Sequence, residues 1–210
     1  MEISAHSREL ARDLLNFIDA SPSPWHAVQT TADRLLHAGF VALREGERWQ
    51  LAAGGRYFVI RGGASIVAFV MGRDNLDTCG FRLVGAHTDS PGLRIKPKAL
   101  QGGDSLLRLG VEVYGGPILA SFADRDLSLA GRVAVRDGNG VDMRLVHFAE
   151  PLLRLPNLAI HMNREVNENG LKFNKQTELP LLLGFGGDGA PEDGRFHSLL
   201  ATRLAVAPDA

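Results

Sequence analysis

The stretch from Arg56 to Met71 reads RYFVIRGGASIVAFVM, and it decides the class of fold. Two runs rich in β-branched and aromatic residues flank the pair Gly62-Gly63, a pattern typical of a β-hairpin. Before residue 39 the periodicity is instead helical, because apolar residues recur every three or four positions. Helices followed by strands in one chain predict an α/β protein.

Two helices are predicted before this hairpin. The apolar positions of the first share one helical face, formed by Leu10, Leu14, Leu15 and Ile18. The second has Ser23 as its expected N-cap and Pro24 at its first helical position. It ends near Gly39, a residue type that readily caps a helix C-terminus. Both helices are expected to be amphipathic.

A polar cluster follows the next apolar run. The run Phe81–Gly85 is predicted to form a strand, and it leads into the sequence AHTDSPG of residues 86–92. His87 and Asp89 are two residues apart, so in an extended backbone their side chains leave the same face. A neutral imidazole binds zinc through one ring nitrogen while a carboxylate fixes the other nitrogen. The pair thus predicts a metal ligand, His87, that is oriented by Asp89.

The same residues also fit a surface loop that has no chemical role. In that interpretation Asp89 begins an Asx-type turn into Ser90-Pro91, and His87 merely lies nearby. Spacing alone favours this second interpretation. The location at the end of an apolar run favours the first, because sites in α/β proteins are commonly built where strands end. Both interpretations stay open at this point.

Composition excludes several classes of protein. The 210 residues carry 23 Lys and Arg against 24 Asp and Glu, so there is no excess positive charge for a nucleic-acid backbone. The longest uncharged apolar stretch, Gly62–Gly72, has 11 residues, whereas a helix needs about 20 to cross a bilayer. The N-terminus mixes charges early, so we expect a cytoplasmic protein. The single cysteine, Cys79, is expected to be a buried structural thiol.

The second half of the chain has a different pattern of residues. From Ile95 to Lys175, short apolar runs and turns predict a separate β-rich module, with a hairpin turn at Asp137–Gly140. The segment Gly194–Leu204 returns to a helical pattern. His161 ends the apolar run Leu158–Ile160, and by itself it is interpreted as a packed or turn histidine rather than a ligand.

Two further patterns have ordinary explanations. Gly184–Gly189 fits G-x-G-x-x-G, but a dinucleotide fingerprint needs an acidic residue about 20 positions later on a second strand. Asp209 is followed only by Ala210, so a glycine-rich loop after a strand is the preferred interpretation. The charges of Asp124–Asp126 are interpreted as an ion pair within a loop, worth about 0 to 1 kcal/mol.

Several motifs together resemble the aspartyl aminopeptidases, the M18 metallopeptidases. They are FIDASPSPWHAV at residues 17–28, GAHTDSP at 85–91, VYGG at 113–116, FADRDLSLAGRV at 122–133 and LAIH at 158–161. Motifs in this order are more specific than any one of them alone, and the similarity covers nearly the whole chain.

The resemblance implies a cytoplasmic enzyme with two divalent metal ions that removes N-terminal Asp or Glu from peptides. His87 would hold one ion, which is zinc or alternatively cobalt or manganese, and Asp89 would orient that histidine. His161 would reach the active site of a neighbouring subunit, as a metal ligand or a substrate contact. The resemblance therefore also implies a homodimer, and commonly a dodecamer built from dimers. No nucleic-acid or membrane partner is expected.

The family architecture divides the chain into three expected parts. Residues 1–94 would begin a mixed-sheet catalytic domain, residues 95–190 would form an inserted β-rich dimerisation domain, and residues 191–210 would return toward the rest of the catalytic domain. The general base and the remaining ligands of the family would lie beyond these residues, so the 210-residue chain alone is predicted to be inactive. The alternative is a non-catalytic oligomerisation or binding module.

Overall fold

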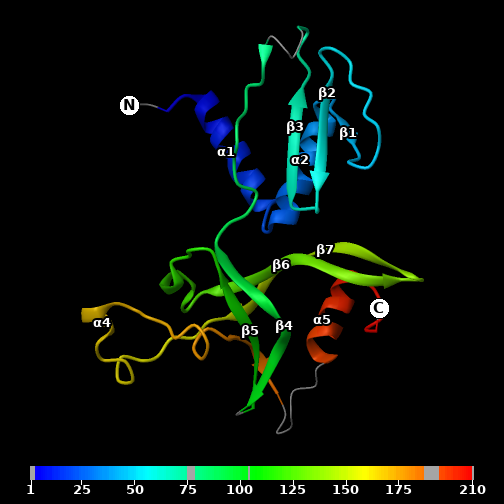
Figure 1. Cartoon of the computed structure of the whole chain (residues 1–210). Coiled ribbons are helices and arrows are strands. Elements are labelled where there is room, and N and C mark those ends of the chain that lie inside the picture. Colours follow the sequence, from blue (N-terminus) through cyan, green and yellow to red (C-terminus); the bar gives the residue numbers. More distant parts are fainter. Residues whose placement is uncertain (1–2, 75–78, 104, 187–193, 210) are drawn as a thin grey trace. The chain divides into compact units, whose positions relative to one another are not determined.

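The fold is described by a computed structural model that covers residues 3–74, 79–103, 105–186 and 194–209. The chain divides into two compact units, which we call unit 1 (Met1–Ser90) and unit 2 (Pro91–Ala210). Both are drawn in Figure 1. The predicted α/β class is confirmed, with a mixed sheet in unit 1 and a curled antiparallel sheet in unit 2.

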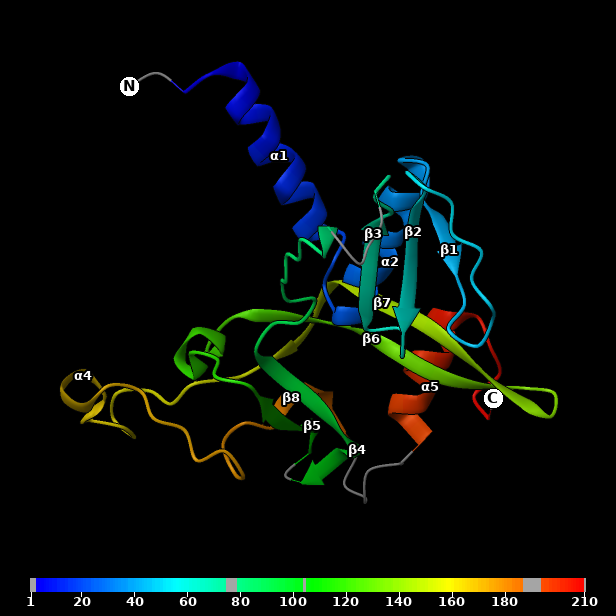
Figure 2. The same ribbon diagram turned by 45° about the horizontal axis from the view of Figure 1, so that its top comes forward.

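Unit 1 combines two helices with a small sheet in its described residues. The elements are α1 (Ala5–Asp19), α2 (Pro24–His37), β1 (Val41–Leu43), β2 (Arg56–Arg61) and β3 (Ser65–Val70). The sheet order is β1-β2-β3, with β1 parallel to β2 and β2 antiparallel to β3. Helix α2 packs on the β2–β3 hairpin, and Figure 2 shows α1 diverging from that sheet.

Local chemistry explains where α2 begins and ends. The Ser23 hydroxyl accepts a hydrogen bond from the His26 amide at 3.4 Å, and Pro24 occupies the first turn, as predicted. At the other end Gly39 has a φ of +79°, a left-handed conformation that glycine adopts without strain. The helix buries its small apolar face, formed by Ala27, Val28 and Ala32.

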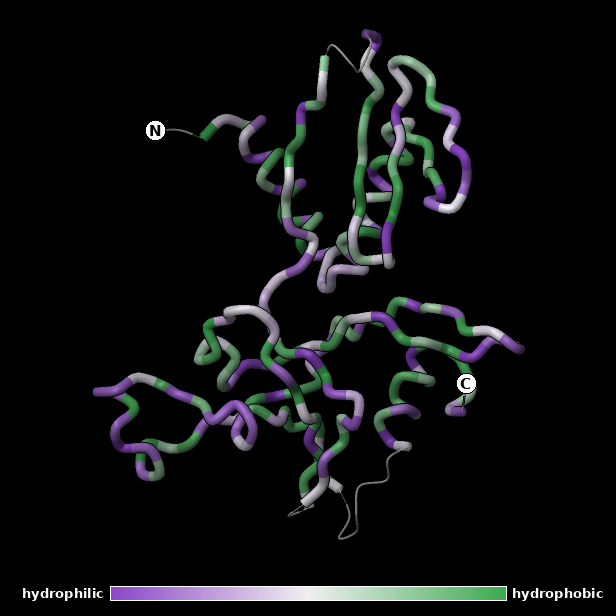
Figure 3. Tube along the Cα trace, in the orientation of Figure 1, coloured by the Kyte–Doolittle hydropathy of each residue, from purple (hydrophilic) through white to green (hydrophobic). Residues whose placement is uncertain are grey.

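Helix α1 is joined to α2 by an ion pair and a cation–π contact. The Arg34 guanidinium donates to both carboxylate oxygens of Asp13 at 2.9 and 3.0 Å, and its Cζ lies 5.2 Å from the centre of the Phe17 ring. The predicted apolar face of α1 is present, but each of its four residues is more than half exposed. In Figure 3 the trace of α1 carries both hydrophobic and hydrophilic positions along its length.

Two predictions for unit 1 are wrong. Phe81–Gly85 forms no strand, and its apolar side chains are exposed, including all of Val84. A strand needs a neighbour to pair its N–H and C=O groups, and no strand of the described residues pairs with this segment. Strand β3 is likewise mostly exposed. Cys79 is exposed as well, so it is not the expected buried thiol.

Unit 2 is built on a sheet that contains five strands in its described residues. They are β4 (Gly92–Gly103), β5 (Leu106–Tyr114), β6 (Asp126–Asp137), β7 (Gly140–Arg154) and β8 (Leu181–Phe185), in the order β4-β5-β8-β7-β6. All pairings are antiparallel, and β8 joins the β4–β5 hairpin to the β6–β7 hairpin. The turn predicted at Asp137–Gly140 connects β6 to β7.

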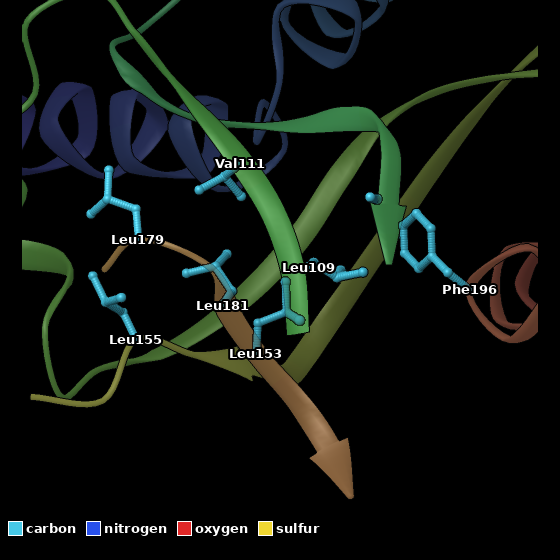
Figure 4. Packing of buried hydrophobic residues seen from close by; sticks show 8 residues of the cluster. Leu109, Val111, Leu153, Leu155, Leu179, Leu181 and Phe196 are labelled. Carbon is cyan, nitrogen blue, oxygen red and sulfur yellow. The ribbon is translucent and has the colours of Figure 1, made fainter. Parts of the chain in front are cut away.

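The core of unit 2 gathers around β8. Leu109, Leu155 and Leu179 are essentially inaccessible to solvent, and each contributes about 1.5 to 3 kcal/mol by its burial. Helix α5 (Gly194–Leu204), at the predicted position, packs on β7 and adds Phe196 to this core. Figure 4 shows these side chains along the sheet, with Phe196 projecting from α5 toward the strands.

The remaining elements of unit 2 are short. They are the 3-10 turn η1 (Leu119–Phe122) and the helix α4 (Val166–Asn169). Of the G-x-G-x-x-G pattern, Gly184 lies at the end of β8, whereas Gly187–Gly189 fall outside the described residues. None of the described helices has both the length and the apolarity that crossing a bilayer requires.

Candidate functional site

The loop of residues 86–90 brings His87 and Asp89 together. His87 Nδ1 lies 3.0 Å from Asp89 Oδ1, and the two side chains leave the same face, as their spacing predicts. Thr88 points to the other face, where its hydroxyl donates to the Ala64 carbonyl at 2.8 Å. This second bond ties the loop to the β2–β3 turn. The histidine-carboxylate pair is thus mounted on the hairpin of unit 1.

The burial of the two side chains suits a metal ligand and its orienting group. The side chain of His87 is 90% exposed, whereas that of Asp89 is 31% exposed. When Nδ1–H donates to the carboxylate, Nε2 is the nitrogen with the lone pair, and it lies on the accessible side of the ring. This is the tautomer that a metal ion requires.

The alternative interpretation, an Asx turn, meets a chemical obstacle. Such a turn uses the backbone N–H two residues after the aspartate, which here belongs to Pro91. Proline has no N–H, so Asp89 has no donor at that position. The Asp89 carboxylate instead contacts the His87 ring.

The donor set of the described residues is too small for a complete metal centre. No group of three or more His, Cys, Asp or Glu side chains in residues 3–74, 79–103, 105–186 and 194–209 is arranged to hold an ion. His87 fits the role of one ligand, and a dinuclear site needs several more.

His161 lies in unit 2, so the structure places the two predicted histidines in different units. It sits in a pair of turns, in which the Met162 amide donates to the Ala159 carbonyl at 2.9 Å and the Asn163 amide to the Ile160 carbonyl at 3.3 Å. His161 is exposed, as are the apolar side chains of Ile160 and Met162. A histidine presented in this way can contact another molecule.

The charges of Asp124–Asp126 behave differently from the prediction. Asp126 pairs with Arg154, whose Nη1 is 2.8 Å from Asp126 Oδ1, rather than within its own loop. Asp124 accepts a hydrogen bond from the Asn157 amide at 3.1 Å. Sequence reasoning missed this contact because the partners are 33 residues apart. The motif at residues 122–133 is the signal that could have drawn attention to it.

The sequence also matches the model of a known protein family. A family model described as Aminopeptidase I zinc metalloprotease (M18) matches residues 17–205, which include His87, Asp89 and His161. The chain belongs to the M18 family. The resemblance expected from the sequence motifs is thereby confirmed.

Curated M18 relatives are similar over almost all of this chain. The Probable M18 family aminopeptidase 2 of Pseudomonas fluorescens (strain Pf0-1) is 50% identical over 198 residues, which are 94% of this chain and 45% of that protein. The protein of the same name from Streptomyces avermitilis is 47% identical over 93% of this chain and 44% of its own length. The chain therefore spans somewhat less than half of the relatives that it matches.

Solved M18 structures share the fold. A cryo-EM structure of the Ape4 and Nbr1 complex matches 99% of this chain and 44% of that chain, with a TM-score of 0.90 and 38% identity. Chaetomium thermophilum mApe1 matches 96% of this chain and 48% of its own, with a TM-score of 0.84 and 29% identity. A structure of the S. cerevisiae mApe1 dodecamer, at 22% identity and a TM-score of 0.72, agrees in fold over 95% of this chain and 45% of its own.

Proposed function

We propose that these residues form the N-terminal half of a metal-dependent aminopeptidase that removes N-terminal Asp or Glu from peptides in the cytoplasm. The observation that carries the proposal is the His87–Asp89 pair, at 3.0 Å, in a chain of a zinc metalloprotease family. The acidic specificity rests on the resemblance of its motifs to the aspartyl aminopeptidases.

The pair defines what this chain contributes to the metal centre. His87 Nε2 is a ligand of one of two divalent ions, with zinc as the first choice and cobalt or manganese as alternatives. Asp89 holds the imidazole in the required tautomer and increases its basicity. When bound, two such ions supply activation of water and neutralise the charge that develops on the scissile carbonyl.

The remaining ligands and the general base come from the part of the family chain that these residues do not match. The exposed apolar surface of unit 1 supports this proposal: the face of α1, Val67 and Val70 of β3, and the segment at residues 81–84 are uncovered. Exposed apolar residues in several segments of one unit favour an interface. We call the protein that contains both halves of the catalytic domain the complete enzyme.

Unit 2 is proposed to form a homodimer, which presents His161 to the active site of the neighbouring subunit. There it is a metal ligand or a substrate contact. The exposed position of His161 in a turn, beside exposed apolar side chains, supports a role at an interface. We also propose that such dimers assemble into a dodecamer.

The test is the release of aspartate from a short peptide with an N-terminal Asp, in the presence and absence of a chelator. The complete enzyme is expected to release aspartate and to lose this activity with the chelator, while the 210-residue chain, with its intact mass checked, is inactive. A peptide with an N-terminal Leu is the matched substrate control. Activity of the 210-residue chain would refute its incompleteness, and inactivity of the metal-loaded complete enzyme would refute the aminopeptidase proposal.

A further inference from the structure

The loop before β6 contains a residue in an unusual backbone conformation. Asp124 has a φ of +53°, in the left-handed region that side-chain-bearing residues rarely adopt. Such a conformation persists only when the surrounding contacts determine it. The contacts of Asp124 therefore show what this loop is built to hold.

All three polar groups of Asp124 bind the segment that leaves β7. Its amide donates to the Leu155 carbonyl at 2.8 Å, and its carbonyl accepts from Arg154 Nη2 at 3.0 Å. Its carboxylate Oδ1 accepts from the Asn157 amide at 3.1 Å. One residue thus holds three positions of a segment 30 to 33 residues away in sequence.

Two further contacts reinforce this attachment. Arg154 binds a second residue of the loop, because its Nη1 also donates to Asp126 Oδ1 at 2.8 Å. Ala123 forms a parallel bridge with Leu155, whose side chain is fully buried in the core of unit 2. The loop of residues 123–126 and the segment of residues 154–157 consequently form one fixed body, which we call the Asp124 clamp.

The clamp ends four residues before His161, and local hydrogen bonds cover that interval. The Asn157 side chain accepts from the Leu158 amide at 2.9 Å. The turns that start at Ala159 and Ile160 then enclose His161. A change in direction at Asn157 would therefore displace the imidazole of His161.

We propose that Asp124 is a positioning residue for His161, and that it sets the direction in which unit 2 presents this histidine to the neighbouring active site. The inference rests on the proposed function for the role of His161, but the clamp itself is a property of unit 2. Asp124 touches neither substrate nor metal in this proposal, and it acts only through the chain that it holds.

The test uses the complete enzyme with Asp124→Ala. We expect kcat/KM to fall by roughly 10 to 100-fold, the usual loss when a residue that orients an active-site group is removed. Asp124→Gly should show the same loss, because glycine accepts the left-handed backbone and removes only the carboxylate. Asp124→Asn should restore activity, since its amide oxygen accepts the same bond and asparagine tolerates this conformation. Asp142→Ala, which removes an exposed carboxylate paired with Arg144, should leave activity unchanged.

A double-mutant cycle decides whether Asp124 acts through His161. If it does, Asp124→Ala causes no further loss of kcat/KM in a His161→Ala background. A full additional loss there would overturn the inference, as would an equal loss from Asp142→Ala. An unchanged kcat/KM in His161→Ala would overturn both this inference and the proposed role of His161.

Amide hydrogen exchange of the 210-residue chain separates the clamp from the catalytic proposal, because it needs no activity. Asp124→Ala should accelerate exchange at the Asn157 amide and at the turn amides of Met162 and Asn163, whereas Asp142→Ala should not. Faster exchange with an inactive complete enzyme would place the failure in the proposed function and support the clamp. Unchanged exchange in Asp124→Ala would overturn the clamp itself.

Discussion

The two units of this chain differ in how completely they bury their apolar residues. Unit 2 closes a core in which Leu109 and Leu179 have no exposed surface, and helix α5 packs against it. Unit 1 buries the middle of β2 and one side of α2, yet it leaves Val84 entirely exposed and Leu14 57% exposed. Since exposed apolar surface is costly in water, the described residues of unit 2 are packed more favourably than those of unit 1.

This difference matters for function because the candidate metal ligand lies in the less complete unit. His87 and Asp89 are held by the β2–β3 hairpin, next to the segment of residues 81–85, which runs without a paired strand among the described residues. His161 belongs to the unit with the closed core. Under the proposed function, unit 2 would supply a rigid platform for His161, while the rest of the catalytic domain would complete the site of unit 1.

The largest expected effect tests whether the site of unit 1 exists in the complete enzyme. His87→Ala should abolish nearly all activity and one of the two tightly bound metal ions, because a direct ligand is lost. Activity and metal content per chain are measured on the same preparation. His6→Ala, an exposed histidine at the start of α1, is the matched control and should change neither quantity. Retained activity in His87→Ala would refute the assignment of His87.

The second prediction compares the packing of the two units directly. Leu109→Ala should lower the free energy of unfolding of unit 2 by about 2 to 5 kcal/mol, because it leaves a cavity in a closed core. Leu14→Ala should change the stability of the 210-residue chain by less than about 0.5 kcal/mol, since this side chain already faces solvent. Urea unfolding, followed by circular dichroism, measures both.

The same two variants, made in the complete enzyme, test whether the face of α1 is covered there. If the rest of the catalytic domain covers α1, Leu14→Ala becomes destabilising there, whereas the cost of Leu109→Ala stays the same. Equal costs of Leu14→Ala in the 210-residue chain and in the complete enzyme would show that the face of α1 remains exposed. In that case coverage by the rest of the catalytic domain would not explain the apolar face of α1.

The elements that the sequence predicted correctly depend on local chemistry. Gly62 and Gly63 both adopt positive φ in the β2–β3 turn, and Gly39 does so at the end of α2. Each of these conformations favours glycine over other residues, so the sequence alone indicates the turn or the cap. The spacing of His87 and Asp89 likewise indicated that both side chains leave one face, as their 3.0 Å contact shows, although spacing alone left their chemical role open.

The elements that were missed depend on distant partners. Strand β4 contains Lys96, Pro97 and Lys98, which obscure a strand pattern, and the sheet accommodates them with a shift in register between Ile95 and Leu100. The contacts of Asp124 with residues 154–157 join positions that no local pattern relates. The segment at residues 81–85 has the composition of a strand, but composition does not supply the neighbouring strand that it would need.

The last prediction concerns Asp89, whose loss is expected to lower activity less than the loss of His87. It compares one carboxylate of unit 1 with one carboxylate of unit 2. Asp89→Asn in the complete enzyme should leave the metal bound and lower kcat about 10 to 100-fold, because an amide nitrogen or oxygen cannot hold the imidazole as a carboxylate does. Asp142→Asn makes the same chemical change in unit 2, where the carboxylate only pairs with Arg144 at the surface, and should have no effect. Metal content and kcat are measured for both variants. Unchanged kcat in Asp89→Asn would show that Asp89 does not orient His87. Loss of metal in this variant would show that Asp89 is itself a metal ligand.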